Sequence, residues 1–266
     1  MGTSPVERCR GRVVLIVTAH GDDCALFMGG TVRLLAEAGC DLHLARFTDD
    51  CTDSDGLDVV DTITRNRHEL EDVARILGIS TIHDQGYPSD TLGDVPRREL
   101  RERVIRLFRT VRPYAVLTID PYSAYGEDNQ DHIRLAQEVD EAFWTAMFDK
   151  HHPEHIAEGL APHGVVERWY AGRRLTEVTD TIDIRTTVEA KVAAAVAHRT
   201  MMGNLMRQLR LMGQTAGVSP EALEQRLADQ DGLVAAGVRR TTEESFRIVR
   251  YAGYHEFFDQ METSLS

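Results

Sequence analysis

Short apolar runs alternate with longer segments of helical periodicity between residues 11 and 150. Residues 13–19 (VVLIVTA) form a continuous, β-branched run, which is typical of a strand buried on both faces of a parallel sheet. Residues 24–38 repeat apolar side chains every three or four positions and precede Gly39, a common helix end. The same patterns predict strands at 41–47, 80–83 and 114–119, and helices at 61–77, 96–111 and 131–148. This alternation predicts βαβ units and an α/β fold with a doubly wound, mostly parallel sheet.

The remaining residues are less regular. The patterns predict strands at 165–170 and 179–184, a long helix at 187–212 and shorter helices at 220–228 and 242–251. In the segment HHPEH at 151–155, Pro153 should interrupt any helix, so we expect a solvated loop. No repeat or linker divides the chain. We therefore expect one domain, 1–266, with an α/β core at 11–150 and a C-terminal portion at 151–266 that covers the substrate.

Composition narrows the class of protein. The chain has 266 residues, of which 43 are acidic and 30 basic, and the net charge of -13 disfavours nucleic acid or anionic lipid as a partner. No apolar run approaches the ~20 residues of a membrane helix, and the opening segment lacks the apolar core of a secretory signal. The four cysteines form no C-x-x-C pair, which favours a reducing compartment. We expect a cytoplasmic protein with a small-molecule or glycoconjugate substrate, and find no signal for its oligomeric state.

Metal-type ligands follow two of the predicted strands. The turn His20-Gly21-Asp22-Asp23 comes directly after the first strand, and Glu127 to His132 follow the fourth. In open α/β sheets, ligands bind beyond the carboxyl ends of the strands. His20, Asp23 and His132 would form a His/His/Asp set with an open position, which suits one catalytic zinc ion, although iron or cobalt would fit the same ligands. Asp22 would then lie within reach of a zinc-bound water as a general base. The alternative is that the aspartates only cap a helix.

These motifs resemble those of a known family. Residues 19–23 (AHGDD) resemble the A-H-P-D-D motif of the PIG-L/LmbE-like zinc N-acetylglucosamine deacetylases, and residues 129–132 (NQDH) are similar to their His-x-Asp-His. The resemblance continues in order along the chain, at residues 67–70, 77–78, 87–90, 112–116, 183–184 and 189–198.

The resemblance implies a Rossmann-like fold and an N-deacetylase that needs zinc. By this resemblance, His20, Asp23 and His132 hold the zinc, and Asp22 is the general base that activates water against an acetamide carbonyl. Zinc would polarise that carbonyl and hold the developing oxyanion. Two further residues, Arg67 and Asp90, are candidates for binding the sugar.

The chain departs from the family pattern at two positions. Gly21 replaces proline, which we expect to loosen the turn. Asn129 replaces a histidine, and an amide can donate a hydrogen bond but cannot titrate. Either protonated Asp22 or another histidine must therefore deliver the proton to the leaving amine. The candidate is His163, in the loop at 162–164, which could also serve as a metal ligand; the alternative is an exposed loop histidine.

A stripe of methionine and leucine lies at helical spacing between residues 201 and 212. It predicts either core packing or an adaptable wall for a large apolar substrate. On the second interpretation, Met201 and Met206 join Asn129 as candidate substrate-binding residues. His198, just before the stripe, is expected to pack or to support the site rather than to bind metal.

The leading functional hypothesis is hydrolysis of the acetamide of an N-acetylglucosaminyl group on a larger conjugate. A glycopeptide antibiotic intermediate suits the methionine-rich wall and the altered second motif. The alternatives are an amidase that acts on a longer N-acyl or thiol-sugar conjugate, and a degenerate relative that binds its ligand without turnover. A nucleotide-dependent dehydrogenase is disfavoured, because the first strand lacks a glycine-rich turn.

Overall fold

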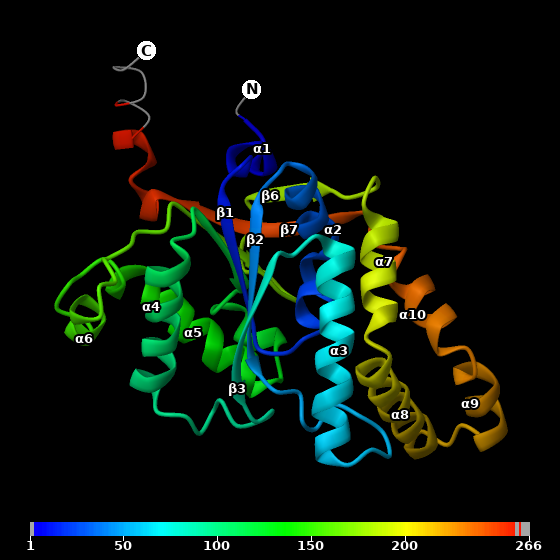
Figure 1. Ribbon diagram of the computed structural model, residues 1–266. Helices are drawn as coiled ribbons and strands as arrows, with labels where there is room; N and C mark the ends of the chain where they lie inside the picture. Colours follow the sequence, from blue (N-terminus) through cyan, green and yellow to red (C-terminus); the bar gives the residue numbers. More distant parts are fainter. Residues whose placement is uncertain (1–2, 259–260, 262–266) are drawn as a thin grey trace.

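The computed structural model describes residues 3–258 and 261, and its centre is a twisted sheet (Figure 1). Within these residues the strand order is β3-β2-β1-β4-β5-β7-β6. The parallel strands are β1 (Val13–Thr18), β2 (Asp41–Thr48), β3 (Thr81–Tyr87), β4 (Ala115–Ile119) and β5 (Glu167–Ala171). Strand β7 (Glu243–Arg250) runs antiparallel to β5 and to the edge strand β6 (Asp180–Asp183). The predicted α/β class with a mostly parallel sheet is confirmed.

Helices cover both faces of the sheet (Figure 1). One face carries α2 (Asp23–Glu37), α3 (Val59–Leu77) and α7 (Val188–Ala197), and the other carries α4 (Arg97–Val111) and α5 (Gln130–Thr145). Strand β1 shows why its sequence is continuously apolar. Val14 and Ile16 belong to one core and Leu15 and Val17 to the other, because successive side chains of a strand point to opposite faces.

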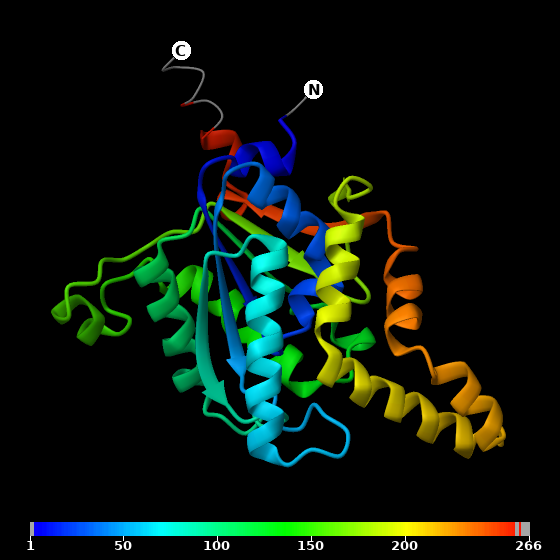
Figure 2. The same ribbon diagram turned by 45° about the vertical axis from the view of Figure 1, so that its right-hand side comes forward.

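The remaining helices lie at the periphery. They are α1 (Pro5–Cys9), α6 (Pro153–Ala157), α8 (Arg199–Thr215), α9 (Pro220–Leu227) and α10 (Gln230–Val238), with short 3-10 turns η1 (Ser123–Gly126) and η2 (Tyr251–Gly253). Helix α10 packs against α7 and α8, and α9 packs against α8. Together α8, α9 and α10 form an arm beside the sheet (Figure 2). No helix in the described residues is long and apolar enough to cross a membrane.

Two predicted elements of the C-terminal portion differ from the structure. Residues 242–251 were predicted to be helical, but 243–250 form β7; Glu244, Phe246 and Ile248 are buried while their neighbours are more exposed, which is the two-residue period of a strand. The long predicted helix is two helices, α7 and α8, separated at His198. Helices α1 and α10 were not predicted.

The HHPEH segment is not the solvated loop that we expected. Pro153 occupies the first turn of α6 instead of interrupting a helix, since a helix needs no backbone N–H donor at that position. His155 on this helix is fully buried.

Candidate metal centre and its pocket

The ends of two neighbouring strands bring the predicted ligands together. After β1, the chain turns at His20 and enters α2 at Asp23, and the Asp23 carboxylate accepts a hydrogen bond from the His20 backbone N–H at 2.9 Å. After β4, Asn129 caps α5: its Oδ1 accepts the backbone N–H of Asp131 at 2.8 Å. This cap places His132 in the first turn of α5, facing the β1 turn.

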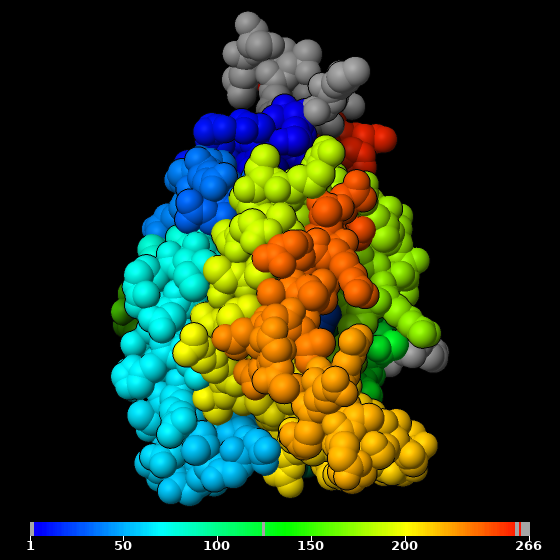
Figure 3. Space-filling model, turned by 90° about the vertical axis from the view of Figure 1, so that its right-hand side faces the viewer, coloured from blue at the N-terminus to red at the C-terminus, as the bar shows by residue number. Residues whose placement is uncertain are grey.

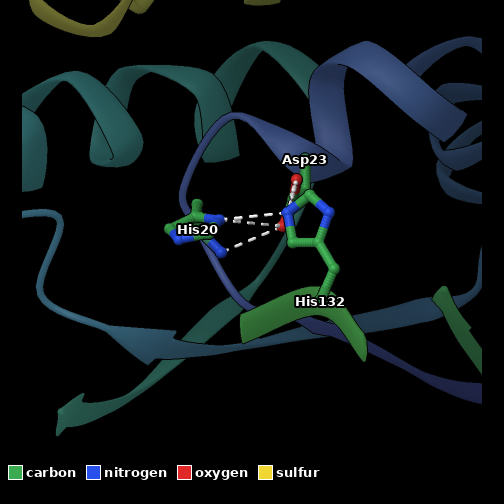
Figure 4. Close-up of side chains that lie close together, drawn as sticks. All are labelled: His20, Asp23 and His132. Atoms are coloured by element: carbon green, nitrogen blue, oxygen red, sulfur yellow. Dashed lines mark hydrogen bonds and ion pairs between the residues drawn. The ribbon is translucent and has the colours of Figure 1, made fainter. Parts of the chain in front are cut away.

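Three inner atoms face a common point (Figure 4). His20 Nδ1 lies 3.1 Å from His132 Nε2, which lies 3.0 Å from Asp23 Oδ1. One ligand-type atom from each of the three residues lies within 4.8 Å of the other two, and all three residues are buried. The arrangement has the donor types and the spacing that a divalent metal ion requires.

The outer atoms of both rings face carboxylates. His132 Nδ1 lies 3.0 Å from Glu127 Oε2, and His20 Nε2 lies 3.4 Å from Asp131 Oδ2. Asp131 is itself held by the backbone N–H groups of Asp90 and Leu92, at 2.7 and 2.9 Å. Metal-binding histidines are usually backed in this way, because a carboxylate on the outer nitrogen fixes the ring and raises its basicity.

Electrostatics favour positive charge at this point. Burial alone would lower the pKa of both imidazoles, but Asp131 and Asp23 raise that of His20 to about 10, and Asp23 raises that of His132 to about 9. The same contacts hold the pKa of Asp23 low, at about 2, against the effect of its burial. A bound metal ion would likewise place positive charge against these carboxylates.

Asp22 precedes α2, where an aspartate often serves only as a helix cap. Its side chain makes no capping hydrogen bond. Burial and the neighbouring charge of Asp23 raise the pKa of Asp22 to about 7. The helix-cap alternative therefore does not account for Asp22, whose carboxylate remains available to a ligand.

A cavity of about 710 Å³ opens above the cluster. His20, Asp23 and His132 form part of its wall, and Asp22, Asp90, Asn129 and Met201, all singled out from the sequence, line it too. Asp128, from the turn at 127–132 that the sequence also singled out, lines the wall as well. Sequence reasoning missed two further charged residues of the wall, which are Asp53 and Arg173. Asp53 and Arg173 lie a few residues after β2 and β5, so the rule that ligands bind beyond the strand ends would have found them.

Three other predicted residues lie outside this cavity. His163 donates a hydrogen bond from Nε2 to the carbonyl of Pro113 at 2.8 Å. Pro113 precedes β4, so His163 lies at the amino ends of the strands, whereas the candidate ligands lie beyond their carboxyl ends. His163 is therefore not in position to protonate a substrate or to bind the metal. Arg67 points to solvent from α3, with its side chain 67% exposed. Met206 lines a separate apolar cavity.

Gly21 does not loosen the turn as expected, because Asp50 holds it. The Gly21 N–H donates to Asp50 Oδ1 at 3.4 Å, and a Cβ at position 21 would lie 3.0 Å from Asp50 Oδ2. Asp50 is fully buried, has a φ of 58° and forms an ion pair with Arg46 at 2.7 Å. Proline at position 21 has no N–H to donate and would crowd the carboxylate.

The methionine stripe divides between core and surface. Met201, Met202 and Met206 are buried in a small cluster with residues of α7 and α10, whereas Leu209 and Met212 are 40% and 59% exposed. Core packing therefore accounts for the buried methionines, which nevertheless form parts of cavity walls.

Comparison with known proteins is consistent with the motifs and the fold. Residues 15–143 match the family described as PIG-L, GlcNAc-PI de-N-acetylase. Residues 15–143 form a PIG-L family domain. This span contains His20, Asp23 and His132 and the carboxylates that face their rings.

Two similar proteins are also deacetylases by name. Diacetylchitobiose deacetylase of Thermococcus kodakarensis is 29% identical over 192 residues, covering 70% of this chain and 69% of that protein. The 1D-myo-inositol 2-acetamido-2-deoxy-alpha-D-glucopyranoside deacetylase of Corynebacterium glutamicum is 28% identical over 232 residues, covering 72% of this chain and 76% of its own. These matches identify the chain as a deacetylase.

Solved structures share the fold. The N,N'-diacetylchitobiose deacetylase from Pyrococcus horikoshii aligns with a TM-score of 0.71 at 23% identity, over 92% of this chain and 86% of its own. The teicoplanin deacetylase Orf2 aligns with a TM-score of 0.54 at 12% identity, over 90% of this chain and 98% of its own. At these identities the likeness establishes the architecture of the PIG-L family domain and its flanking elements.

Proposed function

We propose that this deacetylase hydrolyses the acetamide of an N-acetylglucosaminyl group that is linked to a further sugar, polyol or larger conjugate. The observation that carries the proposal is the cluster of His20, Asp23 and His132 in the wall of an acidic cavity, with Asp22 beside it. The named substrates of the two relatives are both N-acetylated sugars joined to another group, which supports this substrate class.

One zinc ion is the cofactor that we assign to the cluster. The donor set fits it: two imidazole nitrogens and one carboxylate oxygen converge, and each residue has a second atom that a neighbour holds. When bound, zinc supplies a Lewis acid that polarises the acetamide carbonyl and stabilises the negative charge that develops on its oxygen.

Asp22 is the group that we assign to proton transfer. Asp22 lines the cavity beside the cluster and its side chain makes no capping hydrogen bond, so its carboxylate is placed to contact a water held there. Asp22 would take a proton from the attacking water and hold it on its carboxyl group. The same carboxyl group would then return the proton to the nitrogen of the leaving amine.

The residue at position 129 bears on how many groups carry protons in the reaction, because Asn129 stands where the family has a histidine. Its Oδ1 is engaged in capping α5, so its Nδ2 is the atom left to donate a hydrogen bond to a ligand in the cavity. An amide does not titrate, and His163 lies at the other edge of the sheet. We therefore assign Asn129 to positioning the substrate, and both proton transfers to Asp22.

The charge of the cavity favours a neutral, hydroxyl-rich substrate. Five aspartates and one arginine provide the charged side chains of its wall besides the histidines. Carboxylates accept hydrogen bonds from sugar hydroxyls but repel phosphate and carboxylate groups. Asp90 is the member that we assign to the sugar, since its backbone is tied to Asp131 behind the metal cluster.

The deciding experiment compares the Asp22→Asn variant with the matched control Asp72→Asn, an exposed aspartate on α3. Acetate release is measured from N-acetylglucosamine, diacetylchitobiose, N-acetylglucosaminyl inositol and a glycopeptide pseudoaglycone. We expect the unmodified chain to release acetate, and Asp22→Asn to lower kcat by ~10²–10⁴-fold with bound zinc retained. Asp72→Asn should match the unmodified chain.

The alternatives give different outcomes in the same assay. Mass spectrometry that finds a longer acid in place of acetate would favour the amidase for longer acyl groups. A protein that binds these sugars without releasing any acid would be the degenerate binding relative. Activity that survives Asp22→Asn would remove Asp22 from the mechanism.

A further inference from the structure

A second cavity, of about 510 Å³, lies between α8, α9 and α10. Its wall consists mainly of leucine, methionine and valine, including Met206, Leu209, Leu233 and Val238. The ammonium group of Lys191, the one buried cation of this wall, is paired with Glu244 at 2.7 Å. The volume falls within the roughly 300–1,000 Å³ range of small-molecule sites. In Figure 3, α9 and α10 (orange) lie beside α7 and α8 (yellow).

This apolar cavity adjoins the metal pocket, the cavity of about 710 Å³ above His20, Asp23 and His132. Leu26, Met202 and Leu205 line both cavities, so the two share a wall. Met202 is buried and Leu205 is 38% exposed, which makes Leu205 the accessible part of that wall. A ligand whose acetamide lies at the metal cluster can therefore continue past Leu205 without leaving the protein surface.

We propose that the apolar cavity binds the aglycone of the substrate, a hydrocarbon or aromatic group attached to the N-acetylglucosaminyl residue. This inference rests on the proposed function. A polar aglycone would find few partners here, because nine of the thirteen wall residues are leucine, methionine or valine. The Lys191 ammonium is already paired with Glu244, which leaves Arg226 and Thr241 as the hydrogen-bonding side chains of the wall. An apolar group would remove both its own surface and that of the leucines from water, which is favourable in proportion to the area buried. Helices α8, α9 and α10 lie outside residues 15–143, which match the family.

The kinetic test compares methyl and octyl glycosides of N-acetylglucosamine with the same anomeric configuration. If the octyl group enters the cavity, kcat/KM for the octyl glycoside should exceed that for the methyl glycoside by at least ~10-fold, because several methylene groups leave water. Equal values for the two glycosides would overturn the inference.

Gly237 provides a variant that fills the cavity without removing a core side chain. It lies on α10 at the cavity wall, and a Cβ built there meets no atom within 4 Å. Gly237→Phe should abolish the preference for the octyl glycoside and leave the methyl glycoside unaffected. The matched control is Ala236→Phe, an exposed neighbour on α10 outside the wall, which should keep the preference.

A second pair is Leu209→Asn with Leu211→Asn as its control, since both leucines are exposed on α8 and Leu209 alone lines the cavity.

A binding measurement separates this inference from the proposed function. The probe is N-phenyl-1-naphthylamine, whose fluorescence rises in apolar sites. Octyl glycoside should displace it and methyl glycoside should not, and Gly237→Phe should weaken its binding. If no sugar is deacetylated while this displacement occurs, the proposed function fails and the apolar site stands.

Two results would overturn the apolar site while leaving the deacetylase intact. One is acetate release with no displacement of the probe by octyl glycoside. The other is light scattering that shows a dimer which Leu209→Asn dissociates, because a second copy of the chain would then cover the cavity.

Discussion

Two clusters of histidine and carboxylate in this molecule have similar distances between their ligand-type atoms but differ in chemistry. His20, Asp23 and His132 form one, and His152, Glu154 and His155 form the other; in each, ligand-type atoms lie within 4.8 Å of one another. The first lies beyond the carboxyl ends of β1 and β4. The second lies at α6, away from those strand ends.

The difference lies in the other partners of the nitrogen atoms. In the second cluster, His155 Nδ1 accepts from Arg109 at 3.2 Å and its Nε2 donates to Glu102 at 2.7 Å, so neither nitrogen is left for a metal. Arg109 also brings a positive charge. In the first cluster the inner nitrogens face one another and a carboxylate, and the outer nitrogens face carboxylates. Proximity of donors therefore indicates a metal site only when their inner atoms have no partner outside the cluster and the surrounding charge is negative.

The largest expected difference between the clusters comes from removing one histidine of each. His132→Asn should lose bound zinc and lower deacetylation by ~10³-fold or more, because the Lewis acid supplies several kcal/mol of transition-state stabilisation. His155→Asn should retain zinc and activity, and lose about 1–3 kcal/mol of stability by leaving Arg109 and Glu102 without their partner. Metal analysis, acetate release and urea unfolding measure these effects. Zinc loss in His155→Asn alone would reverse the two assignments.

A fourth buried histidine, His198, differs from the other three, since neither of its ring nitrogens has a hydrogen-bond partner among the described residues. Burial lowers its pKa from 6.5 to about 4. His198 in the folded state therefore binds a proton less readily than in the unfolded chain. The free energy of unfolding is unaffected by this group above pH 6.5 and falls as the pH drops toward 4. By this linkage the loss at pH 4 is about 3 kcal/mol.

The control for this loss is His198→Leu, which removes the titrating group. Urea unfolding at pH 7, 5 and 4 should show a smaller loss of stability in the variant, because the other titrating groups are common to both proteins. Equal losses in the two proteins would mean that His198 is protonated in the folded state.

Changing a carboxylate that faces an outer ring nitrogen should have a smaller effect on zinc binding than removing a ligand. Glu127→Gln should weaken zinc binding by ~10–100-fold, since the carboxylate beside His132 Nδ1 orients the ring and raises its basicity. The matched variant is Glu154→Gln, which changes the carboxylate 2.8 Å from His152 Nδ1 in the other cluster. Zinc affinity, measured by competition with a chelator, should be unchanged there. An unchanged affinity in Glu127→Gln would argue against a supporting function.

The smallest effect concerns the turn that holds His20. Gly21→Pro should cost about 1–3 kcal/mol of stability, because it removes the N–H to Asp50 and crowds that carboxylate. Asp50→Gly is itself destabilising because it removes the ion pair with Arg46. The double variant should nevertheless lose less than the sum of the two single losses, since Asp50→Gly makes room for the ring. Thermal unfolding of the two single variants and the double variant measures this coupling. Additive losses would show that the two positions act independently.

Several errors in the sequence analysis share one cause. Residues 242–251 fit a helix by local composition, yet β5 and β6 lie on either side of this segment and make it a strand. His163 was attractive because it lies in a loop, but only its contact with the Pro113 carbonyl reveals which edge of the sheet it occupies. Gly21 appeared permissive until Asp50, 29 positions away, filled the space beside it. Each error concerns a partner that is distant in the sequence.

The sequence by itself determined the parallel α/β core, the chemical type of the ligands and their location after β1 and β4, because side-chain periodicity and strand-end turns are local properties. Only the tertiary structure decided which donors meet without other partners, which histidines are already hydrogen-bonded, and where an apolar cavity adjoins the metal pocket. These depend on contacts between segments far apart in the chain, and such contacts are set by the packing of whole helices against the sheet.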